Sequence, residues 1–154
     1  MWQGEVVAIY IALEKNIALV PKKEIRAVAS KGLEGDRYFK QTGTYSKRHE
    51  PGRQVTLIEI ETIEAIKRDL DIELGLGDSR RNIVTRGVPL NHLVGRKFYV
   101  GSVTMRGIRL TEPCSYLEGL TKDGVRNALE HRAGLNAEIL NDGTLRKGDV
   151  IKEI

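Results

Sequence analysis

The amino-acid sequence predicts a mostly β fold: a closed or nearly closed barrel of antiparallel or mixed strands with two or three flanking α-helices. Short apolar, β-branched runs recur along the chain, about eight to ten in all. Most connections between these runs are short, which favours antiparallel pairing. Closing the resulting sheet on itself would remove its unpaired edges.

Length and composition predict one globular domain over residues 1–154. Hydrophobic residues make up 40% and charged residues 30% of the 154 residues, which is ordinary for a folded domain. The single cysteine excludes an intramolecular disulfide and a zinc site made of several cysteines. No apolar run approaches the roughly 20 residues that span a bilayer. The apolar stretch 6–13 has no basic residue before it and no cleavage pattern after it, so we expect a cytoplasmic protein without a membrane partner.

The first part of the chain predicts three short strands and two loops. The strands are Val6–Ala12, Ile17–Val20, closed by Pro21, and Ile25–Ala29. A loop with two glycines follows over residues 31–37. The polar segment Thr42–Arg53 predicts a long exposed loop, a kind of segment that often carries function.

The middle of the chain predicts a strand, a helix and a second strand. Gln54–Ile58 is apolar and β-branched, as strands are. From Glu59 the apolar period becomes three and four residues, through Ile60, Ile63, Ile66 and Leu70, which predicts an amphipathic helix ending near Leu70. Asn82–Thr85 predicts the next strand.

The last part predicts two hairpins around a helix. Lys97–Val100 and Ser102–Leu110 form a hairpin about Gly101, and Asp123 caps a helix over Gly124–His131. The turn sequence Asn-Asp-Gly at 141–143 predicts a second hairpin, between Ala137–Leu140 and a strand at Leu145. Val150–Ile151 is the last predicted strand.

Charge is segregated along the sequence. Residues 79–111 contain seven basic residues and no Asp or Glu, whereas the remainder carries 18 basic and 21 acidic residues. The basic residues are Arg80, Arg81, Arg86, Arg96, Lys97, Arg106 and Arg109. Such a segment is either a solvated basic face or a site for an anion, such as a phosphate or a nucleotide-like cofactor. Only 5% of the residues are aromatic, and no nucleic-acid-binding signature is present, so nucleic acid is disfavoured as a partner.

Two short polar motifs are candidates for contacting such an anion. Arg80-Arg81-Asn82 enters a predicted strand, and guanidinium groups can grip phosphate oxygens two at a time. Asp36 and Arg37 follow Gly35 and could contact a ligand or simply orient a turn. The alternative for the arginine pair is two solvated side chains.

Cys114 is the candidate for covalent or metal chemistry. It follows Thr111-Glu112-Pro113, and proline suits the first turn of a helix, where backbone N–H groups favour a thiolate. A thiolate is both a nucleophile and a soft metal ligand. The alternative is a buried cysteine that acts as a small hydrophobe. The three histidines, His49, His92 and His131, are far apart in sequence and do not support a paired-histidine zinc site.

Taken in order, several blocks of the sequence resemble the MOSC domain (molybdenum cofactor sulfurase C-terminal domain) family. The blocks are GLEGDR at 32–37, RQVTLI at 53–58, RRNIV at 80–84, LNHLVGRKFYVG at 90–101, EPC at 112–114, RAGLNA at 132–137 and GDVI at 148–151. The resemblance implies a β-barrel-like fold with a few helices. It also implies that Cys114 matches the cysteine that characterises the family.

The resemblance further implies a cofactor and the residues that hold it. In relatives that reduce N-hydroxylated compounds, the matching cysteine ligates molybdenum in a phosphorylated pterin cofactor. The Arg80-Arg81-Asn82 block helps to hold that cofactor in relatives. The predicted cofactor-binding residues are therefore Arg80, Arg81, Asn82, Asp36, Arg37, Lys97 and Thr111, with Cys114 as the metal ligand and catalytic residue.

Three functional hypotheses follow. The first is a molybdenum-cofactor enzyme or enzyme subunit that reduces an N-hydroxylated or N-oxide substrate with electrons from an external donor protein. The second is a sulfur carrier that receives a persulfide on Cys114 from a cysteine desulfurase, for assembly of a metal–sulfur cofactor. The third is a non-catalytic module that binds an anion. The larger reductases have a separate N-terminal domain that this sequence lacks, so an oligomer or a partner protein could complete the site.

Overall fold

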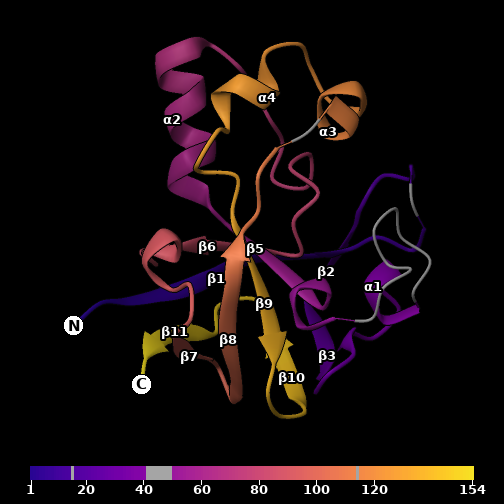
Figure 1. The fold of residues 1–154 in the computed structure, drawn as a ribbon, viewed down its shortest axis with the longest axis vertical. Coiled ribbons are helices and arrows are strands. Elements are labelled where there is room, and N and C mark those ends of the chain that lie inside the picture. Colours follow the sequence, from indigo (N-terminus) through magenta and orange to yellow (C-terminus); the bar gives the residue numbers. More distant parts are fainter. Residues whose placement is uncertain (15, 41–49, 114) are drawn as a thin grey trace.

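The strands form two sheets in the computed structural model, which describes residues 1–14, 16–40, 50–113 and 115–154 (Figure 1). The strands within those ranges are β1 (Gln3–Ile11), β2 (Val20–Lys22), β3 (Glu24–Val28), β4 (Gly32–Leu33), β5 (Val55–Glu59), β6 (Ile83–Arg86), β7 (Lys97–Val100), β8 (Val103–Leu110), β9 (Leu135–Ile139), β10 (Gly143–Arg146) and β11 (Val150–Glu153). The helices there are α1 (Arg37–Lys40), α2 (Ile60–Leu70), α3 (Ser115–Leu120) and α4 (Val125–Ala128), with 3₁₀ turns η1 (Pro51–Arg53) and η2 (Leu90–His92).

The larger sheet closes into a barrel, which confirms the predicted fold class. Its order is β11-β7-β8-β9-β5-β6-β1, and β1 pairs again with β11, with Gln3 opposite Lys152. All neighbours in this ring are antiparallel except β5 and β6. Parallel neighbours need a long crossover, and α2 lies within that connection. The smaller sheet, β10-β3-β4, is separate.

Two apolar clusters occupy the two faces of the barrel wall. Alternate residues such as Leu57, Ile83 and Leu135 belong to the cluster inside the barrel. Their neighbours Ile58 and Val84 point the other way and pack with residues of α2 and α4. Figure 1 shows α2, α3 and α4 gathered above one end of the barrel. The helices therefore cover the part of the outer barrel face that carries Ile58 and Val84.

Several predicted elements agree with the structure. The helix predicted from its apolar period is α2, with Ile60, Ile63 and Ile66 buried as the period requires. The predicted hairpin about Gly101 is the pair β7–β8. Four α-helices lie within the described residues where two or three were predicted; α1, which the sequence did not predict, has four residues and is too short to show a helical period.

The predicted strand Ile17–Val20 is wrong in its bounds. The strand is β2, and it includes Pro21, which stands opposite Tyr10 of β1. β2 is at the end of its sheet, and proline is tolerated on an edge strand because it need not donate to a further neighbour.

The second predicted hairpin is also wrong. The turn at residues 141–143 does not pair β9 with β10, because β10 pairs with β3 in the smaller sheet and β9 pairs with β5 and β8. The Asn141 and Asp142 side chains instead serve other segments: Asn141 Oδ1 accepts from the N–H of Thr104 and Asp142 Oδ1 from that of Ala29. Turn chemistry alone therefore did not decide which strands pair.

Two predicted helix starts differ as well. The residue that caps α4 is Gly124, in a left-handed conformation, rather than Asp123, and the helix ends at Ala128 rather than His131. α3 begins at Ser115, so Pro113 precedes the helix instead of lying in its first turn. The predicted loop 42–53 lies largely in residues 41–49, outside the described residues. No helix among the described residues is long and apolar enough to cross a membrane.

Glu59, at the junction of β5 and α2, has a raised carboxyl pKa. Partial burial is the larger cause and the Glu61 carboxylate adds to it, while the Leu90 backbone N–H and His92 act in the opposite direction. Glu59 therefore keeps its proton to higher pH in the folded chain than in the unfolded chain. The stability that this contributes is complete below the ordinary value of 4.5 and is lost as the pH rises through the raised value.

We expect Glu59→Gln to increase the free energy of unfolding slightly at pH 7, because glutamine keeps a hydrogen-bond acceptor without the partly buried charge. The gain should disappear near pH 4. Urea unfolding at both pH values measures it, with the exposed Glu14→Gln as control. An equal effect at both pH values would contradict the assignment.

Candidate functional site

A row of polar residues crosses the outer face of the barrel wall. Strand register fixes the order of these residues. The Tyr10 N–H donates to the Asn82 carbonyl, Asn82 is level with Thr56, and Thr56 is opposite Asn136. Arg109 of β8 stands next to Asn136 and ends the row. Ile58 and Val84, two residues further along β5 and β6, face the apolar cluster under α2. We call Tyr10, Asn82, Thr56, Asn136 and Arg109 the polar row.

The side chain of Asn82 joins three segments. Its Oδ1 accepts from the backbone N–H of Thr56 at 3.0 Å and from the Thr56 hydroxyl at 3.2 Å. Its Nδ2 donates to the carbonyl of Tyr10 at 3.1 Å and to Asp36 Oδ1 at 3.2 Å. The side chain is completely buried, so each of these groups needs its partner.

Asp36 brings the loop before α1 onto the row. Its buried carboxylate accepts through Oδ1 from the N–H of Ala12 at 2.8 Å, in addition to the Asn82 amide. Its Oδ2 accepts from the N–H of Tyr38. The sequence motif Asp36-Arg37 is therefore fixed against the end of β1.

Arg37 is buried and carries a nitrogen without a hydrogen-bond partner. The residue is 8% exposed, and its Nη2 donates to the carbonyl of Arg80 at 3.3 Å. Its Nη1 is 3.9 Å from Asp36 Oδ1, too far for a hydrogen bond, and no acceptor among residues 1–14, 16–40, 50–113 and 115–154 satisfies it. A buried guanidinium with an unused N–H is costly, and an anion placed there would satisfy it.

Arg80 and Arg81 lie beside Arg37, and both are 8% exposed. Arg80 has a left-handed backbone, and its Nη1 donates to the carbonyl of Ile17 at 2.7 Å. Arg81 Nε donates to the carbonyl of Ala133 at 2.8 Å. The next residue, Gly134, has φ of +121°, and a Cβ there would overlap the Leu57 carbonyl oxygen. Arg37 is thus bound to the backbone of Arg80, Arg81 is the next residue along the chain, and Asp36 is bound to Asn82, so these buried side chains lie in adjoining segments.

Thr111 lies at the other end of the row. Its hydroxyl donates to Asn136 Oδ1, and its N–H donates to the carbonyl of Gly134 at 2.8 Å. Asn136 Nδ2 donates to the carbonyl of Gly52, and the Arg109 guanidinium occupies the space that a Cβ at Gly52 would need. The segment that leads toward Cys114 is therefore bound to the polar row.

Tyr10 has a raised phenol pKa. Burial is the larger cause, and the Asp78 carboxylate adds to it. The phenol therefore stays protonated and able to donate a hydrogen bond at neutral pH.

Five of the seven predicted cofactor-binding residues, Asp36, Arg37, Arg80, Arg81 and Asn82, thus lie in adjoining segments at one end of the polar row, whereas Thr111 lies at its other end. Lys97 lies elsewhere, in a hollow shared with Arg96 and Trp2. Cys114 lies outside the described residues. Among the described residues, no group of three His, Cys, Asp or Glu side chains is placed to hold a metal ion.

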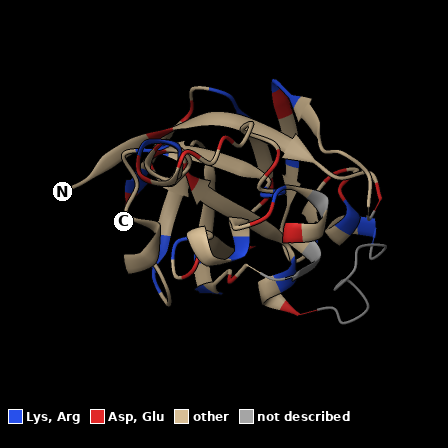
Figure 2. Ribbon diagram, turned by 90° about the horizontal axis from the view of Figure 1, so that it is seen from above, with Lys and Arg blue, Asp and Glu red and all other residues tan. Residues whose placement is uncertain are grey.

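The basic segment does not form one basic face. Figure 2 shows Lys and Arg positions distributed around the ribbon and interspersed with Asp and Glu. Arg86 pairs with Glu64 at 3.6 Å and Arg106 with Glu138 at 3.1 Å, both carboxylates coming from outside the segment. Two of the seven basic residues of the segment are therefore paired at other places in the fold, and only Arg80 and Arg81 adjoin the polar row through Asn82.

Sequence reasoning did not identify Thr56 and Asn136 as site residues. Each is a buried polar residue, 1% and 7% exposed respectively, between two apolar residues of its strand. The sequence did carry a signal for them: each is a polar residue with an apolar residue on either side, at a strand position that faces outward.

Comparison with known proteins identifies the family. The model of the MOSC domain matches residues 44–152, which is more than half of the chain. The chain belongs to the MOSC domain family. This family is linked to the C-terminal domains of molybdenum cofactor sulfurases. No curated protein matches the chain.

Solved structures share the MOSC fold at low sequence identity. The YuaD protein from Bacillus subtilis superposes with a TM-score of 0.78 at 17% identity, covering 98% of this chain and 97% of that one. YiiM from Geobacillus stearothermophilus gives 0.75 at 13% identity, covering 98% and 75%. YiiM from Escherichia coli gives 0.66 at 13% identity, covering 100% and 70%.

We expect Asn82→Asp to destabilise this MOSC domain by about 3–5 kcal/mol, because it places an unpaired buried charge beside Asp36. The loss should shrink as the pH falls, because one carboxyl of the new pair takes up a proton. Urea unfolding at pH 7 and pH 5 measures it, with the exposed Asn127→Asp as control. Equal losses in the two variants would show that the amide of Asn82 has no special role.

Proposed function

We propose that this MOSC domain binds molybdenum cofactor at the polar row and reduces an N-hydroxylated or N-oxide compound, with Cys114 as the molybdenum ligand. Electrons would come from an external donor protein. The observation that carries the proposal is the Nη1 of Arg37, a buried donor that has no acceptor in the part of the chain that the structure describes. The phosphate of the pterin is a group of the right chemistry to accept from it.

The residues around the row fit a phosphorylated group. Arg37, Arg80 and Arg81 carry three positive charges, and Asp36 carries one negative charge. The Asp36 carboxylate already accepts hydrogen bonds from the N–H groups of Ala12 and Tyr38 and from the Asn82 amide. Asp36 thus fixes its neighbours and competes little for Arg37, from which its Oδ1 stands 3.9 Å away. An anion at this point would gain the unused N–H of Arg37.

Cys114 fits the metal by chemistry and by its place in the sequence. Thiolates are soft ligands of the kind that molybdenum takes. Thr111, three residues earlier, is bound to Asn136 and Gly134 at the edge of the row. Glu112 is fixed by the N–H of His131, from which its Oε2 accepts at 3.2 Å. Cys114 is thus three residues along the sequence from a residue that is bound to the polar row.

When bound, the cofactor would supply two-electron chemistry: reduction of an N–O group takes two electrons from the external donor protein and two protons from solvent, and releases the oxygen as water. The protein's own part is to hold the ligand and to set its surroundings. Arg37 anchors the phosphate, and the protonated phenol of Tyr10 can donate to an oxygen of the ligand. The apolar cluster of Ile58, Val84 and the residues of α2 and α4 excludes water on one side of the row.

We expect wild-type protein made in a cofactor-producing host to carry molybdenum and phosphate close to one per chain. Cys114→Ser should lose the metal. Arg37→Met should lower both contents at least about tenfold when free cofactor is limiting, a change worth about 1.4 kcal/mol. Metal analysis and phosphate assay of purified protein measure this.

Arg68→Met, which removes an exposed arginine on α2, is the matched control and should retain both contents. Thermal unfolding of each variant shows whether it is folded. Absence of molybdenum from folded wild-type protein would overturn the proposal. A gain of one sulfur atom on Cys114 after exposure to a cysteine desulfurase would then assign the protein as a sulfur carrier.

A further inference from the structure

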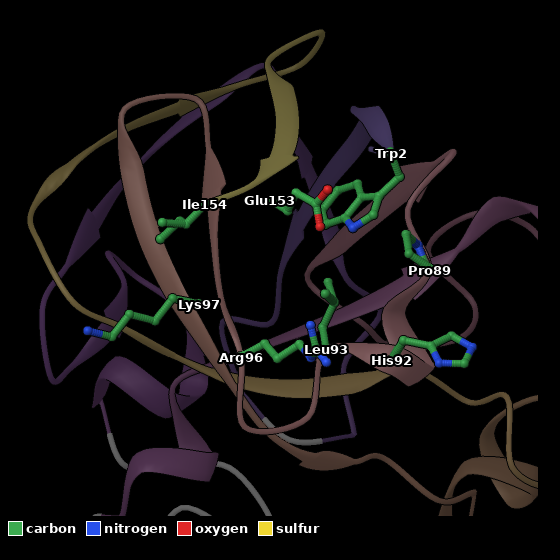
Figure 3. A pocket seen from close by; sticks show the side chains of 8 residues that line it. All are labelled: Trp2, Pro89, His92, Leu93, Arg96, Lys97, Glu153 and Ile154. Atoms are coloured by element: carbon green, nitrogen blue, oxygen red, sulfur yellow. The ribbon is translucent and has the colours of Figure 1, made fainter.

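The hollow that Lys97 shares with Arg96 and Trp2 lies apart from the polar row, and none of its lining residues belongs to that row. Its volume is ≈ 580 Å³, within the range of small-molecule sites. It is formed where the start of β1, the turn η2, the start of β7 and the end of β11 meet. Figure 3 shows the side chains that line it, among them Trp2, His92, Arg96 and Glu153.

One wall of the hollow is apolar and well supported. Trp2 is partly buried and packs against the cluster inside the barrel, so its indole is held by the core. Leu93 is 3% exposed and lies in the same wall. A fixed indole with an accessible edge or face is a stacking surface for a flat ring.

The opposite side of the hollow is basic. The guanidinium of Arg96 has no ion pair or hydrogen bond with any residue that the structure describes. In Figure 3 it lies beside Leu93, whereas the neighbouring Lys97 points away. Lys97 adds positive charge nearby and is unpaired within the same described ranges. This side therefore favours an anionic group.

Glu153 places one negative charge near Trp2. In Figure 3 its carboxylate lies beside the indole, on the side of the hollow away from His92. It makes no ion pair among the described residues. A carboxylate there repels a second anionic group and accepts a hydrogen bond from an amino or hydroxyl group.

We propose that this hollow binds a nucleoside monophosphate. The base stacks on Trp2, the phosphate meets Arg96, and Glu153 accepts from an amino or hydroxyl group of the base or ribose. A flat ring, one anionic end and a hydrogen-bond donor at the other end are the features that these three residues recognise together. Glu153 opposes the continued phosphate chain of a nucleic-acid strand, so a free nucleotide suits the site better than a polymer.

Trp2 is the only tryptophan in the chain, so its fluorescence reports on this hollow alone. We expect AMP to change the fluorescence of the full-length protein saturably. Adenosine and inorganic phosphate should each bind at least about tenfold more weakly than AMP, because each lacks one of the two recognised groups. The affinity for AMP should fall with added salt.

Variants separate the two contributions. Arg96→Ala should weaken AMP binding about tenfold or more, whereas Arg68→Ala on α2 should leave it unchanged. In calorimetry, Trp2→Ala should lose AMP binding and Trp2→Phe should retain most of it. Thermal unfolding shows that each variant is folded.

The proposal is overturned if AMP gives neither saturable fluorescence change nor heat with the wild-type protein. It is also overturned if Arg96→Ala binds AMP as tightly as wild type, or if phosphate alone binds as tightly as AMP. None of these results depends on molybdenum or on Cys114, so they leave the proposed function of the polar row to its own test.

Discussion

The hydrogen bonds of the Asn82 side chain are the interaction on which the candidate site depends. One amide satisfies Thr56 of β5, Tyr10 of β1 and Asp36 of the loop before α1. These segments are 26 to 72 residues away from Asn82 in the sequence. Because Asp36 is held, Arg37 is brought against the Arg80 carbonyl, and its remaining N–H faces a site without an acceptor.

The barrel explains why this arrangement lies on its outer face. Inside, alternate strand residues are apolar and fill the cluster that includes Leu57, Ile83 and Leu135. Outside, Ile58 and Val84 of the same strands pack against the helices, and Thr56 and Asn82, two residues earlier, belong to the polar row. On each strand, the residue that packs against the helices is therefore only two positions away from the residue of the proposed site.

The sequence predicted the barrel class, α2 and the β7–β8 hairpin because their signals are local: apolar period, β-branched runs and a glycine turn. It mispredicted the pairing of β9 with β10 because the turn at 141–143 is local while the strand partners are not. Among the site residues, the motif around Arg80 was visible as adjacent charged residues. Thr56 and Asn136 became visible only when strand register placed them beside Asn82 and Thr111. Charge along the sequence was a weaker guide, because Arg86 and Arg106 find carboxylates contributed by α2 and β9.

The pairing of β1 with β11 has a consequence for how the protein is made. Residues near 3 and 152 are neighbours in the closed ring, so the barrel closes through a contact that spans nearly the whole described chain. Contacts of such sequence separation form slowly, and they cannot form during synthesis until the last strand has emerged from the ribosome. Until then both β1 and β7 expose strand edges that β11 later covers. Until β11 pairs, the nascent chain therefore exposes two strand edges at which aggregation can begin.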